Sequence, residues 1–487
     1  MTKINIESEK NSIINYKYDR ANCTSGIVHI GIGNFHRAHQ QFYTNQLLEN
    51  PTQHNWGICG VALLPSDEKL IKSLEKQNGE YTLTVCGGNS DNKIYTIGSL
   101  IELIWGVENP NAVIDKIARP TTKIITLTIT EGGYNIDNTS KKFMLEEPSI
   151  LHDIQNPENP KTVFGFIAAG LRKRMNAGQE GITILSCDNL QHNGDTAKYA
   201  FTAFLEKQDS QLKEWASNNV SFPNSMVDRI TPATKPEDVI WLNEQNNTND
   251  EVPVYCEDFI QWVIEDNFIA GRPQWEDVGV EFTDDVSTYE NMKLSLLNAS
   301  HTLLSYPSFL AGFRKVDEAM NNELILKLLK DFMDIDITPY VPAPKNTDLE
   351  IYKATLLERF ANPAVSDQVS RLCFDGISKF PVYIVPNLTK MIADNKDLTR
   401  VAFLIASYRA YLKNKIDDNG AAYEIGEPWL TNEEYAFVEN ENPEAFLNFK
   451  PFKGCPLASS QNFMQLYLNF VKEINDQDTL SVLKTIV

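Results

Sequence analysis

The sequence has no cysteine pair and no metal-binding spacing. Its seven cysteines form no C-x-x-C, and their odd number does not suggest a disulfide framework, so we expect free thiols. The seven histidines include no H-x-x-x-H and no H-E-x-x-H, which are spacings typical of zinc sites. His36 and His39 lie three residues apart but have no third ligand nearby. We therefore expect a protein that binds no metal.

Positive charge is scarce as well. The chain has 44 Lys and Arg residues against 65 Asp and Glu residues, and its formal net charge is -21. This balance, with no run of basic residues, opposes binding to nucleic acid. No stretch reaches the roughly 18 apolar residues that cross a membrane, and residues 1–20 lack the features of a signal peptide. We expect a cytoplasmic protein, a monomer or a small homo-oligomer, that acts on a small molecule without nucleic-acid or membrane partners.

Buried strands alternate with helices in the first half of the chain. Apolar or β-branched runs, typical of parallel strands buried on both faces, occupy residues 26–33, 56–63, 122–130 and 181–188. Helical patterns occupy residues 38–49 and 163–175, and a β excursion in the same layer is indicated at residues 80–86 and 93–98. Because 487 residues are too many for one compact core, we expect at least two domains. We predict an α/β fold with a Rossmann-type, doubly wound domain over residues 1–285.

The strand signal fades from about residue 286 onward. Long helical patterns then follow, at residues 293–305, 319–333, 349–361, 399–413 and 461–473. Pro-rich connections separate some of them, and we find no internal repeat. We therefore predict a mainly α-helical second domain over residues 286–487, which carries the substrate-binding and catalytic residues.

A glycine-rich turn follows the first predicted strand. In "HIGIGNFHRAH", two glycines stand between an apolar strand and a helical segment, which is the setting that a dinucleotide pyrophosphate needs. The candidate coenzyme-binding residues of this turn are Gly31, Gly33, Asn34, Phe35 and Arg37. The guanidinium of Arg37 can supplement the helix end against phosphate. His36 replaces the third glycine of G-x-G-x-x-G, and a plain tight turn is therefore the alternative.

Polar residues follow three further predicted strands. Asp67 follows the second strand and is the natural partner of a ribose diol, although it lies further from Gly33 than the usual spacing of about 20 residues. A carboxylate there repels a 2′-phosphate and favours NAD over NADP. Glu131 and Asn189 follow the next two strands, so we expect both to lie near the glycine turn. For Asp188 and Asn189, a turn or a helix N-cap is the alternative.

One predicted helix mixes charged residues with leucines. The stretch "YENMKLSLLNASH" contains no glycine, and the helix is expected to end at Pro307. At about 100° per residue, Glu290, His301 and Asn298 lie about 60°, 80° and 140° from the direction of the lysine at position 293, on one broad face. The leucines on this face predict a walled, partly dry site. The alternative is a surface lysine, an asparagine bonded to nearby backbone and an ordinary core histidine.

Seven sequence blocks together resemble one known family. They are "VHIGIGNFHRAHQ", "TEGGY", "SCDNLQHNG", "MVDRITP", "QWVIEDNF", "GRPQWEDVGV" and K-x-x-x-x-N-x-x-H at residues 293–301. Their types and order are similar to those of the polyol-specific long-chain dehydrogenase family, from about residue 26 to about residue 410. The resemblance implies metal-independent hydride transfer between a nicotinamide coenzyme and a secondary alcohol of an open-chain polyol.

The resemblance also implies catalytic roles. Lys293 corresponds to the catalytic base, and Glu290 to a residue that serves proton exchange with solvent. Asn189 and Asn298 correspond to the pair that stabilises the oxyanion, and His301 to a residue that orients the substrate. The residue types agree with this chemistry, because a lysine desolvated among leucines has a lowered pKa and offers a neutral amine as base.

Further residues are assigned by the resemblance to the substrate and the coenzyme. Arg371 and Lys379, in "RLCFDGISKFP", correspond to a substrate-holding pair. Asp228, in "MVDRITP", lies in a matched block and is given a supporting role on the coenzyme side. One position departs from the family pattern. Ser66 precedes Asp67 where related enzymes can carry a second acid, and this weakens the predicted preference for NAD.

Our first hypothesis for the reaction is NAD-dependent oxidation of D-mannitol to D-fructose. A reductase of sugar acids such as fructuronate or tagaturonate is an alternative in the same family, because Arg371 can hold a carboxylate as readily as hydroxyl groups. Oxidation of arabinitol or sorbitol is another. A nucleotide-sensing regulator with an inactive site belongs to a different class, and the intact Lys293, Asn298 and His301 argue against it.

Overall fold

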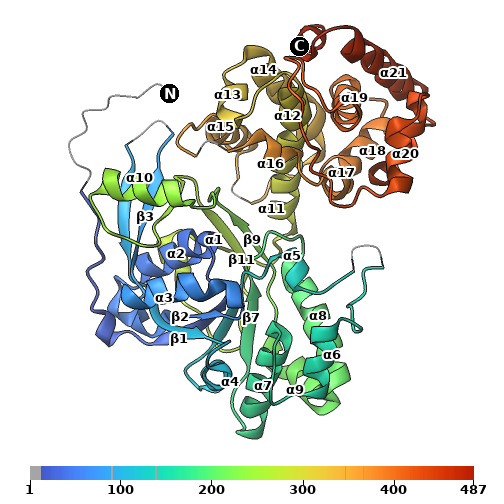
Figure 1. Cartoon of the computed structure of the whole chain (residues 1–487). Coiled ribbons are helices and arrows are strands. Elements are labelled where there is room, and N and C mark those ends of the chain that lie inside the picture. Colours follow the sequence, from blue (N-terminus) through green and yellow to red (C-terminus); the bar gives the residue numbers. More distant parts are fainter. Residues whose placement is uncertain (1–11, 89–90, 138–139, 346, 366) are drawn as a thin grey trace. The chain divides into compact units, whose positions relative to one another are not determined.

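The structure is a computed structural model that describes residues 12–88, 91–137, 140–345, 347–365 and 367–487 (Figure 1). The chain divides into two compact units, the first ending at Ser287 and the second beginning at Thr288. Each unit encloses hydrophobic cores of its own. Over the described ranges, no helix combines the length and the apolar character that crossing a membrane requires.

The first unit is built on a six-stranded parallel sheet. Its strands are β1 (Ser25–Ile30), β2 (Gly57–Ala62), β5 (Leu100–Trp105), β6 (Ile124–Leu127), β7 (Ile182–Ser186) and β8 (Val220–Ser221). They lie in the order β5-β2-β1-β6-β7-β8, and each neighbouring pair is parallel. The order reverses between β1 and β6, which is the switch point of a doubly wound sheet. The predicted Rossmann-type α/β fold is confirmed.

Both faces of this sheet are buried. Val28 of β1 belongs to one core together with Phe164, whereas its neighbour Ile27 belongs to another core together with Leu74. This alternation explains why the strands were recognisable as continuous apolar runs.

The helices of the unit are α1 (Asn34–Ala38), α2 (Gln40–Leu47), α3 (Glu68–Lys76), α4 (Pro110–Ala118), α5 (Thr130–Gly133), α6 (Pro148–Gln155), α7 (Val163–Asn176), α8 (Asn193–Gln208), α9 (Ser210–Asn219) and α10 (Pro236–Asn246). Short 3-10 helices are η1 (Arg20–Asn22), η2 (Pro51–Trp56), η3 (Pro65–Asp67) and η4 (Trp275–Val278).

Two small sheets complete the first unit. One has the order β10-β3-β4 and the other β12-β11-β9. Their strands are β3 (Tyr81–Cys86), β4 (Lys93–Ile97), β9 (Ser225–Asp228), β10 (Val254–Glu257), β11 (Gln261–Glu265) and β12 (Glu281–Thr283). The predicted β excursion is thus present as β3 and β4, but these strands form a separate sheet, in which β3 lies between β4 and β10, and do not extend the parallel one. Sequence analysis did not predict the second small sheet.

The second unit is helical, as predicted. Its α-helices are α11 (Ser287–Met292, which begins at the unit boundary), α12 (Ala299–Leu310), α13 (Val316–Met320), α14 (Glu323–Asp331), α15 (Leu349–Phe360), α16 (Val369–Cys373), α17 (Gly376–Tyr383), α18 (Val385–Ala393), α19 (Thr399–Asn414), α20 (Asn432–Glu439), α21 (Gln461–Asp476) and α22 (Thr479–Leu483). Two π-helical segments, η5 (Lys293–Asn298) and η6 (Phe332–Ile337), and the 3-10 helices η7 (Thr338–Tyr340), η8 (Pro443–Asn448) and η9 (Lys450–Phe452) join them.

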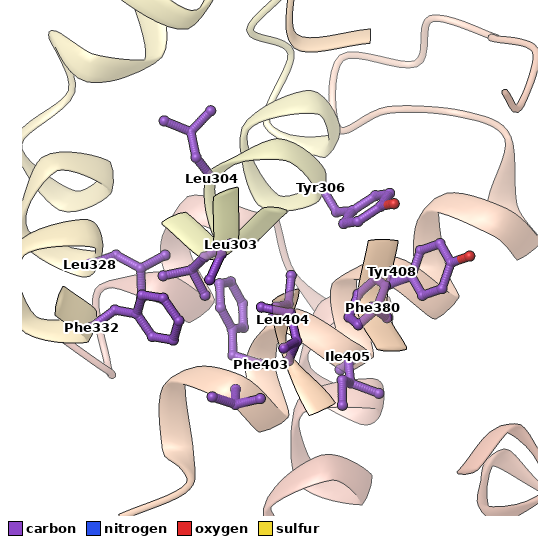
Figure 2. Packing of buried hydrophobic residues seen from close by; sticks show 14 of the residues in the cluster. Leu303, Leu304, Tyr306, Leu328, Phe332, Phe380, Phe403, Leu404, Ile405 and Tyr408 are labelled. Carbon is purple, nitrogen blue, oxygen red and sulfur yellow. The ribbon is translucent and has the colours of Figure 1, made fainter. Parts of the chain in front are cut away.

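Helices α12 and α19 form the centre of the hydrophobic core of the second unit. Leu303 of α12 and Phe403 of α19 are both fully buried, and Figure 2 shows them among side chains from α14, η6 and α17. Aromatic rings pack beside them, with the rings of Tyr306 and Tyr408 centred 4.6 Å apart and those of Phe380 and Tyr408 4.7 Å apart. All residues of helix α12 except His301 are buried.

The predicted helix around Lys293 differs from expectation in two ways. It is not uniformly α-helical, because the π-helical segment η5 separates α11 from α12. It also does not end at Pro307, which lies inside α12, and the helix continues to Leu310. Proline removes one hydrogen bond from a helix. Burial of the surrounding turns against the core outweighs that loss, since Tyr306 and Leu310 are 0% and 2% exposed.

Candidate active site

The glycine turn after β1 has the shape that a pyrophosphate requires. Gly31 has φ +103°, and a Cβ there would overlap the carbonyl oxygen of Thr128, so only glycine fits. At Gly33, no described atom outside the residue and its two chain neighbours comes within 4 Å of the position that a Cβ would take. Gly33 is also the N-cap of α1, which begins at the next residue. Its uncovered backbone lets a ligand approach closely, and the turn fits a dinucleotide on these two observations.

Two other residues of the turn are held by the protein itself. Arg37 is 3% exposed, and its guanidinium donates to the carbonyl oxygen of Val252 at 2.6 Å and to Oδ1 of Asn34 at 2.6 Å. Asn34 donates in turn to the carbonyl oxygen of Pro232 at 3.2 Å. These contacts fasten the turn to the segments that precede α10 and β10. They give Arg37 a structural task, and contact with phosphate stays a prediction.

The helix after the turn begins at Asn34 and is interrupted at His39, so the prediction of one helix over residues 38–49 was wrong in its bounds. The ring of His36 lies parallel to that of His29, with centroids 3.3 Å apart. Burial lowers the pKa of His36 well below its ordinary value and that of His29 to about 3, so the two rings pack as neutral groups. Nε2 of His39 lies 2.9 Å from the carbonyl oxygen of Gln261. Over the part of the chain that the structure describes, no group of three or more His, Cys, Asp or Glu residues is arranged to hold a metal.

The candidate coenzyme residues follow neighbouring strands. Because β2, β1, β6 and β7 are adjacent and parallel, their carboxyl ends lie at one edge of the sheet. Asp67 follows β2 at this edge and is half-buried, whereas Glu131, after β6, and Asn189, after β7, are exposed. Asp228 comes from another sheet, as the last residue of β9, and is 6% exposed. Ser225, at the start of β9, donates to the carbonyl oxygen of Ser186 at the end of β7, so β9 begins beside the same edge.

Asp188 anchors the loop that carries Glu131. Its carboxylate accepts hydrogen bonds from the backbone N–H groups of Ile129 at 3.1 Å and Thr130 at 2.8 Å, and from the hydroxyl of Tyr134 at 2.7 Å. Thr130 has φ +64°, which a β-branched residue rarely adopts. The loop is thus held in a strained shape at the end of β6. The alternative expected from sequence, a local turn or helix N-cap, does not describe these contacts, because they join Asp188 to residues far away in the sequence. Burial raises the pKa of Asp188.

The mixed helix in the second unit is buried at its polar residues. Glu290, Lys293 and Asn298 are 4%, 7% and 9% exposed, and Met292 and Leu296 beside them are 0% exposed. A surface lysine is therefore excluded. The prediction of a walled, partly dry setting for this lysine agrees with these exposures.

The π-helical segment changes the geometry of that face. A π-turn contains one residue more than an α-turn, so each π-bulge turns the residues after it back by roughly 100°. With one bulge in η5, Asn298 moves from about 140° to about 40° relative to Lys293, and His301 from about 80° to about −20°. Glu290, before the bulge, stays at about 60°. The four side chains then share an arc of about 80°, narrower than a regular helix would give.

His301, Arg371 and Lys379 are electrostatically coupled in the second unit. Burial first, and then the positive charge of Arg371, lower the pKa of His301 to about 3, so its imidazole is neutral. Its ring packs on that of Phe360, with centroids 4.2 Å apart. Burial and the charge of Arg371 also lower the pKa of Lys379. The structure thus brings together the three residues that the resemblance gave to the substrate.

Asp367 is a neighbour that sequence analysis missed. Nε of Arg371 donates to Oδ1 of Asp367 at 2.7 Å, and a second ion-pair contact joins the same two side chains. Nζ of Lys379 donates to the carbonyl oxygens of Leu372 at 3.0 Å and Arg371 at 3.3 Å. The spacing of four residues between Asp367 and Arg371 was the signal that could have found the pair.

The second unit therefore supplies a proton acceptor and hydrogen-bonding groups in one buried helix. An amine that leaves water favours its neutral form, which can take a proton from an alcohol. A carboxamide and a neutral imidazole can hold the oxygen from which that proton leaves. The first unit supplies a turn suited to a dinucleotide. Each of these features, taken by itself, is one that hydride transfer to or from an alcohol carbon requires.

Comparison with known protein families finds two matching models. The model described as the mannitol dehydrogenase Rossmann domain matches residues 25–277, and the model of the mannitol dehydrogenase C-terminal domain matches residues 285–474. Together they account for nearly the whole chain.

Similar individual proteins are found among curated sequences and solved structures. A polyol:NADP oxidoreductase of Gluconobacter oxydans (strain 621H) is 38% identical over 439 residues, which are 90% of this chain and 90% of that protein. The structure of Pseudomonas fluorescens mannitol 2-dehydrogenase in ternary complex with NAD and D-mannitol is 41% identical, with a TM-score of 0.85 and coverage of 97% and 96% of the two chains. A D-sorbitol dehydrogenase in substrate-free form is 37% identical, with a TM-score of 0.91 and coverage of 96% of each chain.

Replacing Asp188 by Asn should destabilise the first unit. The amide has the shape of the carboxylate, but its NH₂ group cannot accept a hydrogen bond. At least one group that donates to Asp188 would therefore lose its acceptor, which costs about 1–3 kcal/mol. We expect the thermal unfolding midpoint to fall by several degrees. Tyr134→Phe is the matched control. It removes the hydroxyl that bonds to Asp188 and Ser186, leaves the two backbone bonds, and should cost about 1 kcal/mol for each bond lost. Equal midpoints for Asp188→Asn and the unaltered protein would show that the carboxylate does not anchor this loop.

Proposed function

The chain belongs to the mannitol dehydrogenase family, and from this premise we propose that it oxidises D-mannitol to D-fructose with NAD. The observation that carries the proposal is the buried set on α11 and η5: Lys293, Glu290 and Asn298 are 7%, 4% and 9% exposed. A buried amine, a carboxylic acid and a carboxamide on one face can accept, relay and stabilise the charges that alcohol oxidation creates.

Lys293 acts as the general base in this proposal. Its surroundings of Met292, Leu296 and Leu297 exclude water, and desolvation favours a neutral amine. The amine removes the hydroxyl proton of the substrate while the hydride leaves the same carbon, so that a ketone and an ammonium form. Bound NAD supplies the acceptor of that hydride. Glu290, one turn before Lys293 on the same face, then takes the proton toward solvent and restores the amine.

Asn298 stabilises the developing alkoxide. Its buried Oδ1 has no hydrogen-bond partner among the described residues, which supports a role for this carboxamide in binding a substrate hydroxyl. Donors aimed at an alkoxide contribute about 3 kcal/mol each. Asn189, in the first unit, is proposed for the same task on the strength of the family resemblance. His301 stays neutral and orients the substrate through a hydrogen bond.

Gly31, Gly33, Asn34 and Phe35 hold the pyrophosphate side of the coenzyme in this proposal, with Glu131 and Asp228 in supporting positions. Gly31 provides the tight turn, and the uncovered backbone of Gly33 meets the phosphates. Asp67 accepts hydrogen bonds from the ribose hydroxyls. Arg37 serves by holding the turn in place.

The Arg371–Asp367 ion pair favours a polyol over a sugar acid. Asp367 neutralises the charge of the Arg371 guanidinium, which weakens its attraction for a substrate carboxylate. The ion pair can still donate hydrogen bonds to hydroxyl groups and accept them. The sugar-acid reductases of the family therefore come second. Sorbitol and arabinitol remain alternatives to mannitol within the proposal.

A panel of substrates tests the proposed reaction. NAD reduction should be faster with D-mannitol than with D-sorbitol, D-arabinitol or D-mannonate, when kcat/KM is compared. Arg371→Ala should raise KM for mannitol and leave the Kd of NAD nearly unchanged, because the arginine is proposed to hold the substrate and not the coenzyme. A preference for mannonate that disappears in Arg371→Ala would instead assign the chain to the sugar-acid branch.

The coenzyme preference tests Asp67. The unaltered protein should have a much higher kcat/KM with NAD than with NADP, since a carboxylate at this position repels a 2′-phosphate. Asp67→Ser should narrow that ratio, whereas the same change of charge at exposed Glu75 should not. The preference needs measuring because the Gluconobacter relative is named for NADP. Equal kcat/KM with both coenzymes in the unaltered protein would remove Asp67 from the proposed site.

Replacing Lys293 by Ala tests the base. The variant should fold and bind NAD, yet its kcat for polyol oxidation should fall by roughly 100-fold to 10,000-fold, the range for losing a general base. Added small amines should restore part of the turnover, because the alanine leaves space for them. Lys330→Ala, a change of an exposed lysine in α14, is the control and should keep normal kcat. A near-normal kcat in Lys293→Ala would rule out the base.

A further inference from the structure

A buried carboxylate lies behind the residues proposed to hold the substrate. Glu427 follows α19 in a segment without regular structure and is 9% exposed. Oε1 accepts the N–H of Gly376 at 2.8 Å and the hydroxyl of Tyr408 at 2.7 Å, and Oε2 accepts the N–H of Ile377 at 3.2 Å. Both backbone groups belong to the first turn of α17, where helix N–H groups have no partner within the helix. Glu427 therefore caps α17 from a distant part of the chain.

The turn before α17 has a demanding shape that depends on this cap. Asp375 has φ +58°, and its N–H donates to the carbonyl oxygen of Gly426 at 2.7 Å. At Gly376, a Cβ would overlap the hydroxyl of Tyr306 and would lie 2.7 Å from Oε1 of Glu427. Only glycine lets the carboxylate approach the backbone this closely. The Asp-Gly pair in the middle of "RLCFDGISKFP" is thus explained by the position of Glu427.

Both candidate substrate residues lie next to this turn. Arg371 is in α16, before the turn, and Lys379 is in the first turns of α17, after it. Nζ of Lys379 reaches back across the turn to the carbonyl oxygens of Leu372 at 3.0 Å and Arg371 at 3.3 Å. A change in the direction of α17 would therefore move Lys379 relative to Arg371.

We propose that Glu427 is a positioning residue for substrate binding, whose ionised carboxylate holds the Asp375–Gly376 turn so that Arg371 and Lys379 face the polyol together. This inference rests on the proposed function of the Arg371–Lys379 pair. Glu427 itself does not contact the substrate and acts through the backbone of α17.

The charge of Glu427 changes near neutral pH. Burial raises its pKa to about 7, against the hydrogen bonds from Tyr408, Ile377 and Gly376, which favour the ionised form. The titratable groups that face it from the packed elements are Tyr306 on α12, Cys373 on α16, Asp375 in the turn, Lys379 on α17, and Tyr408 and Tyr411 on α19. Burial raises the pKa values of the tyrosines and the thiol further above neutrality, so these stay uncharged. Lys379 carries the nearby positive charge.

The sign of the pH effect follows from the hydrogen bonds. Above about pH 7 the carboxylate is ionised and accepts strongly from both N–H groups. Below that pH the carboxyl group of Glu427 carries a proton, which needs a hydrogen-bond acceptor. The groups that bond to Glu427 are donors, so the proton is poorly accommodated. The cap on α17 then weakens. KM for the polyol should therefore rise as the pH falls through about 7.

Replacing Glu427 by Gln tests the proposal in the full-length protein. KM for D-mannitol at pH 8 should rise about tenfold, the order expected for losing a charge-assisted hydrogen bond, while kcat changes much less. Between pH 6 and pH 8 the KM of the variant should lack the pH dependence that Glu427 causes. The ratio of its KM to that of the unaltered protein should therefore shrink toward pH 6. Glu424→Gln, the same change at an exposed position of the same segment, should leave KM unchanged. Equal KM values for Glu427→Gln and the unaltered protein at pH 8 would overturn the proposal.

A second variant covers the case in which Glu427→Gln does not fold. Tyr408→Phe removes one donor that stabilises the ionised carboxylate, so it should raise the pKa of Glu427 and move the rise in KM to higher pH. If Glu427 only supported the fold, Tyr408→Phe would lower the melting temperature and leave the pH profile of KM in place.

Amide hydrogen exchange separates a failure of this proposal from a failure of the proposed function. In the unaltered protein, exchange at Gly376 and Ile377, corrected for the intrinsic rate, should be faster at pH 6 than at pH 8. Glu427→Gln should make it fast at both. An unaltered protein that shows this exchange pattern but oxidises no polyol would refute the proposed function and keep the positioning role. Exchange that is the same at both pH values in both proteins would refute the positioning role, whatever the activity.

Discussion

The desolvation of one lysine is the constraint on which the second unit depends. Lys293 is 7% exposed, and removing an amine from water favours its neutral form. Lys293 is placed there because α11, η5 and α12 form a continuous helical spine and α12 lies at the centre of the second core. In the proposed mechanism, the core that stabilises the fold is also the medium that favours Lys293 as a base. Stability and reactivity have a common origin in this helix.

The π-helical segment η5 determines the directions in which the polar side chains of this helix point. A regular helix would spread the four polar side chains over a wide arc, partly toward the core. One extra residue in η5 turns Asn298 and His301 toward the side of Lys293 and Glu290. Such a segment loses regular hydrogen bonds, and π-bulges occur frequently at functional sites. Farther along the chain, Glu427 performs a related task, because it shapes the backbone at Gly376 from outside the helix that carries Lys379.

Much of this organisation could be predicted from the sequence, for physical reasons that particular residues make clear. The parallel strands were visible because both faces of the sheet are buried, as at Ile27 and Val28. Gly31 was recognisable because the turn after β1 admits no side chain. Lys293 drew notice because charged residues rarely stand among leucines. These are local signals, each contained in a few neighbouring positions.

The features that could not be predicted depend on contacts between distant segments. Burial against α19 keeps Pro307 inside a helix, which no local rule for proline anticipates. Arg37 binds the carbonyl oxygen of Val252, and Glu427 binds the backbone of Gly376, across wide separations in the sequence. Local patterns therefore indicated the candidate reacting groups, whereas the residues that hold their surroundings in place became visible only in the fold.

The pH dependence of kcat/KM for polyol oxidation tests the central claim most directly. If desolvation makes Lys293 the base, kcat/KM in the unaltered protein should rise with pH along a limb whose midpoint lies below the roughly 10.4 of a free lysine, and Lys293→Ala should lack that limb. A limb that persists unchanged in Lys293→Ala would contradict the claim, because the proton would then be removed by another group.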